Sequence, residues 1–228
     1  FSGYLMIGVD QYLHNADHEN YGLTTACEML QIQYPQIQQE FYMFSLKELV
    51  PKVQTDEIDV GISIIHESKI NSPLLNGLQY TVLCQDQISL FISQKVWQRT
   101  CQWDNVRDTL CKLKFLCMEN DTEFTIERMS SLAAVGINAP IRYCASWSEL
   151  QFRASVGEGF YILASKAAKH VAQDMQAIPL IKLGHNEQIF TVVFWKKEGN
   201  PLVVPFLDFL ASLEQKGSDC LPLESHHT

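Results

Sequence analysis

The 228-residue chain is poor in positive charge. It has 17 lysines and arginines against 26 aspartates and glutamates, which gives a formal net charge of −9 at pH 7. A surface that binds a phosphate backbone must be basic. We therefore do not expect these residues to bind nucleic acid themselves, and the five arginines are also scattered: Arg99, Arg107, Arg128, Arg142 and Arg153.

Membrane and secretion signals are also missing. No stretch reaches the roughly 20 consecutive apolar residues of a transmembrane helix, and no segment has the organisation of a signal peptide. We expect a cytoplasmic protein with no membrane partner. The sequence starts at Phe1 without a methionine and leads at once into a strand-like segment. We therefore expect a fragment whose N-terminal part is absent.

Paired cysteine motifs are absent. The number of cysteines is odd, no pair has C-x-x-C spacing, and most lie among apolar neighbours. This pattern favours buried, reduced thiols in a cytosolic protein over a disulfide framework. The seven cysteines are Cys27, Cys84, Cys101, Cys111, Cys117, Cys144 and Cys220.

The common catalytic motifs do not occur. The chain has no G-x-S-x-G elbow, no P-loop and no H-E-x-x-H pair. The acidic group Asp56, Glu57 and Asp59 is typical of a solvated turn, and Cys84 or Cys117 would need a histidine brought close by the fold. We expect no enzyme and no cofactor.

What the chain does have is the composition of a globular protein. Hydrophobic residues make up 46% and charged residues 19%, which excludes a disordered chain. The length suits one large domain or two small lobes.

The stretch Glu57–Glu67 predicts where a ligand site lies. Its segment Ile58–Ile64 is apolar and rich in β-branched residues, and polar residues follow it. It is typical of a buried strand whose carboxyl end opens into a loop. Ligands of open α/β sheets bind beyond such ends, so we expect a small-molecule cleft there.

Strand-like and helix-like segments alternate along the chain. This alternation predicts an α/β fold with a mainly parallel sheet covered on both faces. Pro51 is unfavourable inside a helix, so we expect it in or near a first turn. Strands are predicted at 4–9, 39–44, 58–64, 78–83, 88–93, 113–118, 141–145, 160–164, 178–183 and 188–195, and helices at 21–33, 46–53, 106–110, 124–135, 147–156, 166–173 and from 199 to a stop at Gly217.

A strand, a helix and a second strand occur twice in the same order. The first unit spans 41–64 and the second spans 141–164. In each, the pattern S-x-x-E at the helix start, Ser45–Glu48 and Ser146–Glu149, matches a capping box. We interpret the two units as equivalent parts of two lobes.

The segments 78–93 and 188–195 are candidates for crossing between these lobes. In that case residues 1–85 and 188–228 form one discontinuous lobe, and residues 86–187 form the other. The final helix then belongs to the first lobe.

Several segments together resemble the effector-binding, or regulatory, domain of LysR-type transcriptional regulators. The resemblance covers nearly the whole chain, although Pro51 and the Ala-Ser ending of the 157–164 run depart from the usual pattern. The segments that carry it are Gly3–Gly8, Tyr34-Pro35, Leu49 with Asp56–Ile62, Pro73-Leu74 with Leu78 and Val82-Leu83, Ser146, and Val156–Leu163.

The resemblance implies two Rossmann-like lobes joined by two hinge strands, as in type 2 periplasmic binding proteins. It also implies a small-molecule effector between the lobes and a homo-oligomer, a dimer that becomes a tetramer in the full-length protein. DNA would be a partner only through a winged-helix domain upstream of this chain. Effector binding would then act allosterically by changing the relative position of the lobes. The rival interpretation is a solute-binding protein of the same fold.

Candidate effector contacts come from three loops and one further helix start. A helix start offers free amides and a partial positive charge, which suit a polar acceptor. The candidates are Asp10, Gln11, Tyr12 and His14 after the first strand, Ser63, Ile64, Ile65 and His66 after the opening strand, Asn120, Asp121, Thr122 and Glu123 before the 124–135 helix, and Ser146.

Each candidate has a structural alternative. Ser146 and Thr122 are also good N-caps, and a residue can cap a helix while its backbone amide meets a ligand. The histidines His14, His18 and His66 suggest a metal site only weakly, because no tight ligand set appears, and we expect none. The apolar face of the 21–34 helix is either a subunit contact or part of the core.

Overall fold

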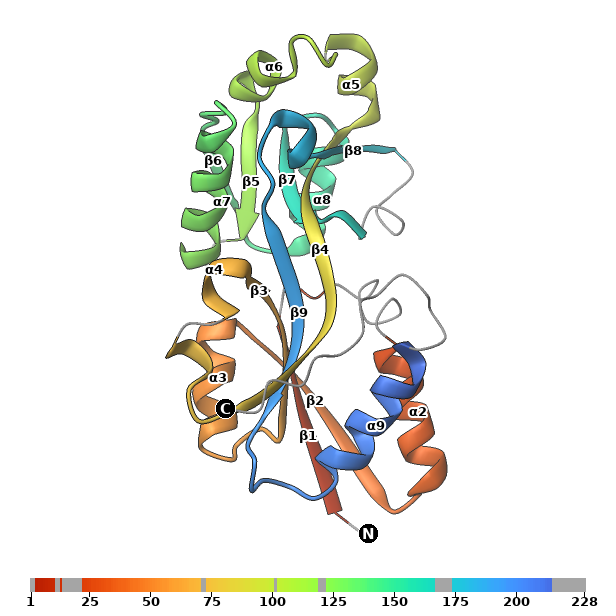
Figure 1. The fold of residues 1–228 in the computed structure, drawn as a ribbon. Coiled ribbons are helices and arrows are strands. Elements are labelled where there is room, and N and C mark those ends of the chain that lie inside the picture. Colours follow the sequence, from red (N-terminus) through yellow and green to blue (C-terminus); the bar gives the residue numbers. More distant parts are fainter. Residues whose placement is uncertain are drawn as a thin grey trace. The chain divides into compact units, whose positions relative to one another are not determined.

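The computed structural model describes residues 3–10, 13, 22–70, 73–100, 102–118, 122–166 and 174–214 (Figure 1). The chain divides into two compact units. Unit 1 comprises Phe1–Asp86 and Gln188–Thr228, and unit 2 comprises Gln87–Glu187. The chain therefore passes between the units twice, at residues 86–87 and 187–188.

Unit 1 is a sheet with helices on both faces. The order of its strands is β2-β1-β3-β9-β4; β1 is parallel to β2 and β3, and β9 is antiparallel to β3. Its elements are β1 (Gly3–Asp10), α2 (Leu23–Gln33), β2 (Ile37–Phe44), α3 (Leu46–Gln54), β3 (Val60–His66), α4 (Glu67–Ile70), a 3-10 turn (Pro73–Leu75), the first part of β4 (Gln79–Ser93), β9 (Gln188–Trp195) and α9 (Val203–Glu214).

The alternation of side chains along β1 explains the two layers of unit 1. Leu5, Ile7 and Val9 point into the core that α2 and α9 cover, and these two helices pack on each other (Figure 1). Gly8 points the other way, where a Cβ would lie 2.2 Å from Leu49 of α3. Successive strand residues face opposite sides, so each face of the sheet has its own helices.

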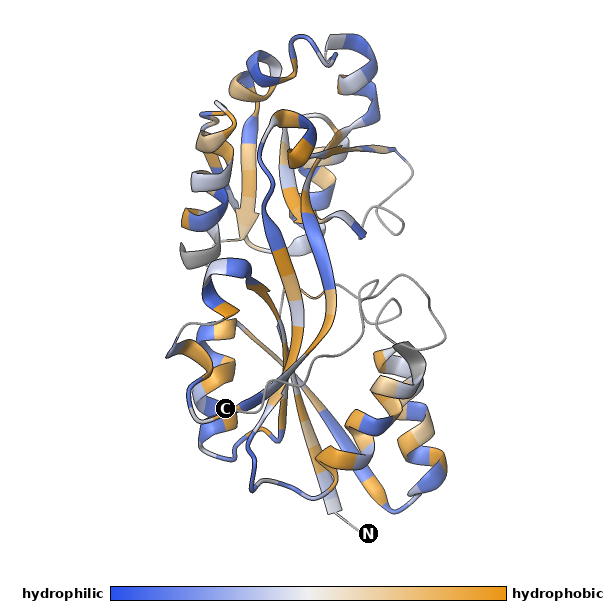
Figure 2. Ribbon diagram, viewed as in Figure 1, coloured by the Kyte–Doolittle hydropathy of each residue, from blue (hydrophilic) through white to orange (hydrophobic). Residues whose placement is uncertain are grey.

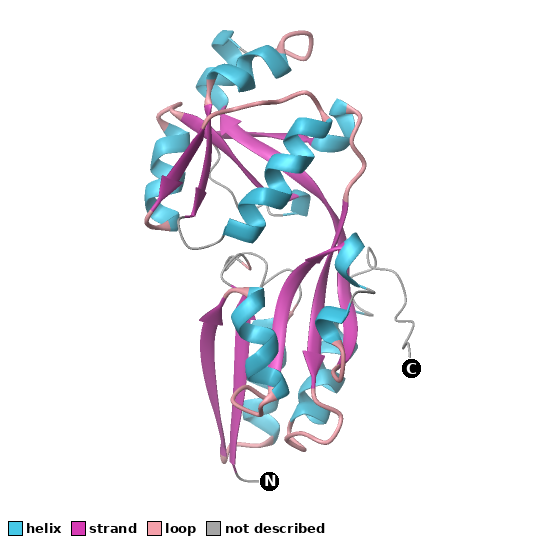
Figure 3. Ribbon diagram, turned by 90° about the vertical axis from the view of Figure 1, so that its left-hand side faces the viewer, coloured by secondary structure: helices cyan, strands magenta, loops and turns pink. Residues whose placement is uncertain are grey.

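Unit 2 repeats this layout. Strands β5, β6 and β7 are parallel neighbours, and β4 runs antiparallel to β7 and β8. Figure 3 shows helices flanking the strands in each unit, and Figure 2 shows apolar residues on the strands and on parts of these helices. The elements are the end of β4, α5 (Gln94–Thr100), α6 (Val106–Lys112), β5 (Lys114–Met118), α7 (Thr122–Ala134), β6 (Ile141–Cys144), α8 (Trp147–Ser155), β7 (Gly159–Ala164), β8 (Met175–Pro179) and a 3-10 turn (Leu180–Leu183).

The α/β expectation is confirmed, with local corrections. Pro51 lies inside α3 and not in its first turn, and its missing N–H cannot donate to the carbonyl of Lys47, four residues earlier. The polar residues after His66 form the short helix α4 where a loop was expected. The Glu48 half of the predicted capping box forms, since the Ser45 backbone N–H donates to Glu48 Oε2 at 3.1 Å. The Ser45 hydroxyl donates to the same oxygen at 2.8 Å.

Several other boundaries differ from the prediction. The strand predicted at 58–64 is β3, Val60–His66, so Ser63 to His66 lie within the strand and not after it. The two runs expected at 78–83 and 88–93 form one continuous strand, β4 (Gln79–Ser93), which Gln85–Gln87 do not interrupt. The extended run expected at 178–183 ends at Pro179 and continues as a 3-10 turn that Gly184 closes with a φ of 87°. Helix α9 begins at Val203, after Asn200 accepts a hydrogen bond from the Leu202 N–H. The helix at 166–173 and the stop at Gly217 lie outside the described residues.

The five cysteines that the structure describes are thiols. Cys84, Cys117 and Cys144 are buried, and Cys27 and Cys111 are half-buried. Burial raises the pKa of Cys27 to about 12, which keeps this thiol protonated and unreactive. Cys101 and Cys220 lie outside the described residues. Among the described helices, none is long and apolar enough to span a membrane.

Candidate functional site

The carboxyl ends of β1 and β3 bring two predicted contacts together. These strands pair in parallel through Val9 and Ile62, and the next residue of each strand is a candidate, Asp10 and Ser63. The Ser63 hydroxyl donates a hydrogen bond to the Asp10 carboxylate. Both side chains are buried, Asp10 at 4% and Ser63 at 0% exposure. Topology alone thus joins two residues that are 53 positions apart.

Further along β3, the predicted residues have local roles. Ile64 is half-buried and packs against the core shared by β1, α2 and α9, while Ile65 is fully buried on the α3 side. The Nδ1 atom of His66 accepts the Ser68 N–H at 3.0 Å and lies 2.6 Å from the Ser68 hydroxyl. His66 therefore stabilises the start of α4, and its Nδ1 is already used.

In unit 2, Ser146 is the N-cap of α8. Its hydroxyl accepts the Glu149 N–H at 3.1 Å, and Glu149 Oε2 accepts the Ala145 N–H at 2.9 Å. This Ala145 hydrogen bond and the neighbouring Arg153 lower the pKa of Glu149. The capping role is confirmed, and the exposed Ser146 remains a candidate contact as well.

Helix α7 begins at Thr122 itself. Thr122 is thus the first helical residue and not the predicted N-cap. The candidates Gln11, Tyr12, His14, Asn120 and Asp121 lie outside the described residues, as does His18. Among the residues that the structure describes, no group of three or more His, Cys, Asp or Glu side chains is placed to hold a metal ion.

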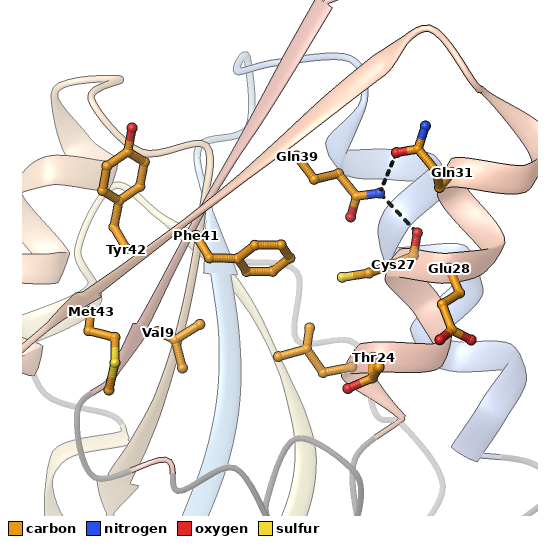
Figure 4. A pocket seen from close by; sticks show the side chains of 10 residues that line it. Val9, Thr24, Cys27, Glu28, Gln31, Gln39, Phe41, Tyr42 and Met43 are labelled. Atoms are coloured by element: carbon orange, nitrogen blue, oxygen red, sulfur yellow. Dashed lines mark hydrogen bonds between the residues drawn. The ribbon is translucent and has the colours of Figure 1, made fainter.

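A feature that the sequence did not predict is an apolar groove of about 560 Å³ on unit 1. It runs between the edge strand β2 and helix α2, and Figure 4 shows Phe41 directed toward α2. Gln39 closes one end by donating to the carbonyl of Cys27 at 2.9 Å. Phe41 is 53% exposed and Met43 is 67% exposed. The groove is lined by Val9, Leu23, Thr24, Cys27, Glu28, Gln31, Gln39, Phe41, Tyr42 and Met43.

The equivalent edge of unit 2 is apolar as well. Strand β6 ends the order of strands there as β2 does in unit 1. Tyr143 on β6, together with Phe152 at the end of α8 and Val156 just after it, is exposed. Exposed large apolar side chains on both edges make these edges candidates for an interaction site.

The α2 face that was a candidate subunit contact is core. Leu23, Ala26 and Leu30 are buried against β1 and α9. Outside that face, Ile32 of α2 is exposed, and β2 exposes Phe41, Tyr42 and Met43. An alternating apolar strand does not reveal in its sequence that it lies at an edge, so this surface was missed.

The fold is that of the two-lobed effector-binding domains of LysR regulators. Similar solved structures include the BenM effector binding domain with its effector benzoate (13% identity, 99% of each chain covered, TM-score 0.71). Others are the reduced form of the regulatory domain of OxyR2 from Vibrio vulnificus (16%, 94% of this chain and 95% of that chain, 0.66), and CbnR, a LysR family transcriptional regulator (15%, 92% and 69%, 0.64). No protein-family model and no curated protein matches the chain. The resemblance inferred from the sequence is thus confirmed at the level of the fold.

Proposed function

We propose that this chain is the effector-sensing domain of a LysR-type transcriptional regulator. The observation that carries the proposal is the fold shared with the BenM effector binding domain over 99% of both chains. The Asp10–Ser63 pair at the carboxyl ends of β1 and β3 supports it, because ligands of α/β sheets bind at such ends. Units 1 and 2 are then the two regulatory lobes.

In this role the chain binds and does not catalyse. A small molecule that binds one arrangement of the lobes better than another shifts their equilibrium by the difference in its binding free energies. The shift passes through residues 86–87 and 187–188, where the chain runs between the units. DNA contact belongs to a winged-helix domain outside this acidic chain, and CbnR has been solved at full length with its target DNA. The proposed location is the cytoplasm.

The proposed oligomer uses the two apolar edges. The groove between β2 and α2 on one copy suits the β6–α8 edge of a second copy, since both expose large apolar side chains. Their charges are also complementary: Glu28 lines the groove, and Arg142 is exposed on β6. A twofold arrangement would use each contact twice.

A thermal-shift screen of aromatic acids, amino acids and sugars tests the proposal. We expect at least one compound to raise the melting temperature in a saturable manner. The screen should include benzoate, the effector of BenM. A complete absence of stabilising small molecules across these three classes would contradict it.

The alternative is a solute-binding protein of the same fold. The coding sequence upstream of Phe1 separates the two functions. A winged helix of roughly 60 residues followed by a linker helix supports the regulator. A signal peptide there would end that proposal and favour the solute-binding protein.

A further inference from the structure

A buried ion pair lies where the chain leaves unit 2. Glu187 is the last residue of this unit, and its Oε1 atom lies 2.5 Å from Nη1 of Arg128, in the middle of α7. Both side chains are only 4% exposed. The pair therefore connects helix α7 to the second of the two points at which the chain crosses between units.

The other contacts near this crossing are more exposed to solvent than the Arg128–Glu187 pair. His185 Nε2 lies 3.1 Å from the other oxygen of Glu187 and is partly exposed. The two crossing segments, 85–87 and 186–188, are joined by exposed amide pairs, Gln85 to Gln188 at 2.9 Å and Gln87 to Asn186 at 3.4 Å. Exposed neutral pairs compete with water and fix a position poorly, whereas a buried charge must keep its partner.

Helix α7 and the segment before the crossing are also joined at a second point. The Arg107 side chain donates from Nε to the carbonyl of Val135 at 2.8 Å and from Nη2 to the carbonyl of Leu183 at 3.0 Å. Val135 directly follows α7. The helix and residues 183–187 are thus joined at both the middle and the end of the helix, so a displacement of one displaces the other.

We propose that Arg128 is a positioning residue that holds the second crossing segment on α7. Thr122 and Glu123, at the start of the same helix, are candidate effector contacts, so α7 connects the site to the crossing. The connection of α7 to an effector site rests on the proposed function. The holding of the second crossing segment by Arg128 does not depend on it. A buried ion pair is often no more stabilising than apolar residues of similar size. What the Arg128–Glu187 pair contributes here is therefore the fixed position of Glu187.

The test separates position from stability. Arg128→Met removes the Arg128 guanidinium from the buried Glu187 carboxylate, and we expect a lower melting temperature. The double variant Arg128→Met with Glu187→Met replaces the pair by apolar side chains and should recover most of that loss. Arg128→Lys keeps the charge and serves as the conservative control.

The deciding readout is amide hydrogen exchange without any effector. It is the exchange rate of residues 185–189 divided by that of the β5 core, residues 115–117, within the same variant. We expect this ratio to rise about tenfold in the double variant even where the melting temperature recovers, and to rise less in Arg128→Lys. A ratio unchanged from the wild type in the double variant would overturn the proposal, whatever its melting temperature.

A second arm uses any compound that the thermal-shift screen identifies. The double variant should bind it with an affinity within about threefold of wild type, yet lose the binding-induced change in exchange at residues 185–189. The same change in both proteins would refute the connection between α7 and the crossing. If no compound binds, the effector proposal fails while the effector-free ratio still decides the role of Arg128.

Discussion

The hydroxyl of Ser63 donates a hydrogen bond to the buried carboxylate of Asp10. The two residues follow the paired positions Ile62 and Val9 on parallel strands. Because the hydroxyl hydrogen is used, the Ser63 oxygen has only acceptor positions left, and an ionised Asp10 is likewise an acceptor. This end of the sheet therefore suits the donor groups of an effector better than its acceptors.

Ser63→Ala should lower the free energy of unfolding by about 1–3 kcal/mol, since it deprives a buried carboxylate of a hydrogen-bond donor. Denaturant unfolding measures this change. The matched control is Ser212→Ala on α9, whose exposed hydroxyl donates to the Phe209 carbonyl at 2.8 Å. The control should change stability by less than about 0.5 kcal/mol. Equal effects of the two variants would contradict a structural role for the pair.

Acid should weaken unit 2 through Glu149 and Glu158. The pKa of Glu149 is lowered by the Ala145 N–H and by Arg153, and that of Glu158 by Lys114 and Arg153. A carboxylate whose pKa is lowered in the folded state stabilises the protein at pH values above its ordinary pKa of 4.5. That contribution is lost as the pH falls through the folded-state pKa.

The double variant Glu149→Gln with Glu158→Gln should therefore show a flatter decline of urea midpoint below about pH 4.5 than the wild type. Glu198→Gln, at an exposed position, is the control and should keep the wild-type slope. A double variant that declines as steeply as the wild type would show that other groups govern the acid response.

Gly159→Ala should be among the most damaging substitutions in unit 2. A Cβ there would lie 2.2 Å from the backbone oxygen of Lys114, its partner in the β5–β7 pairing. Backbone cannot move aside as a side chain can, so we expect a loss of about 3 kcal/mol. Gly77→Ala meets open space at a φ of 81°, and its cost should be about 1 kcal/mol. Similar losses at both sites would refute this packing argument.

Phe41→Glu should weaken self-association. The substitution places a charge in the groove between β2 and α2, where Glu28 already lies, and a like charge opposes burial of this surface. Sedimentation velocity should show the dimer of the wild type dissociating at concentrations about tenfold higher in the variant. Val204→Glu, at an exposed apolar position on α9, should leave the dimer intact. A wild type that is monomeric at every concentration would contradict the proposed oligomer.

Much of the fold was predictable because buried strands are continuous apolar runs. Strand β9 begins and ends at the predicted residues Gln188 and Trp195, and the contact of Asp10 with Ser63 follows from parallel strands that share one edge. Pro51 was misplaced because a local rule says nothing of the tertiary contacts that override it. Leu49, Val50 and Val53 of the same helix are buried, and their packing keeps α3 continuous through the proline.

Other parts depend on contacts that no local pattern encodes. Arg128 lies in an amphipathic helix, where an arginine is normally solvated. Its partner Glu187 is 59 residues away, in a polar segment without periodicity. The exposure of Phe41 and Met43 depends on β2 being an edge strand, which is decided by the order of strands and not by its own residues. Sequence reasoning therefore located most strands and the meeting of β1 and β3 at their carboxyl ends, but missed the edge position of β2 and the Arg128–Glu187 ion pair.

The proposed function requires that the chain bind a small-molecule effector, and candidate contacts lie on each unit. Isothermal titration calorimetry tests it most directly, with the best compound from the thermal-shift screen and the wild type, Ser146→Ala, Thr122→Ala and Ser63→Ala chains. Saturable binding with one effector per chain is the predicted result, with the dissociation constant raised about fivefold or more in at least one variant of each unit. Wild-type affinity in all three variants, or no binding by the wild type, would contradict the account.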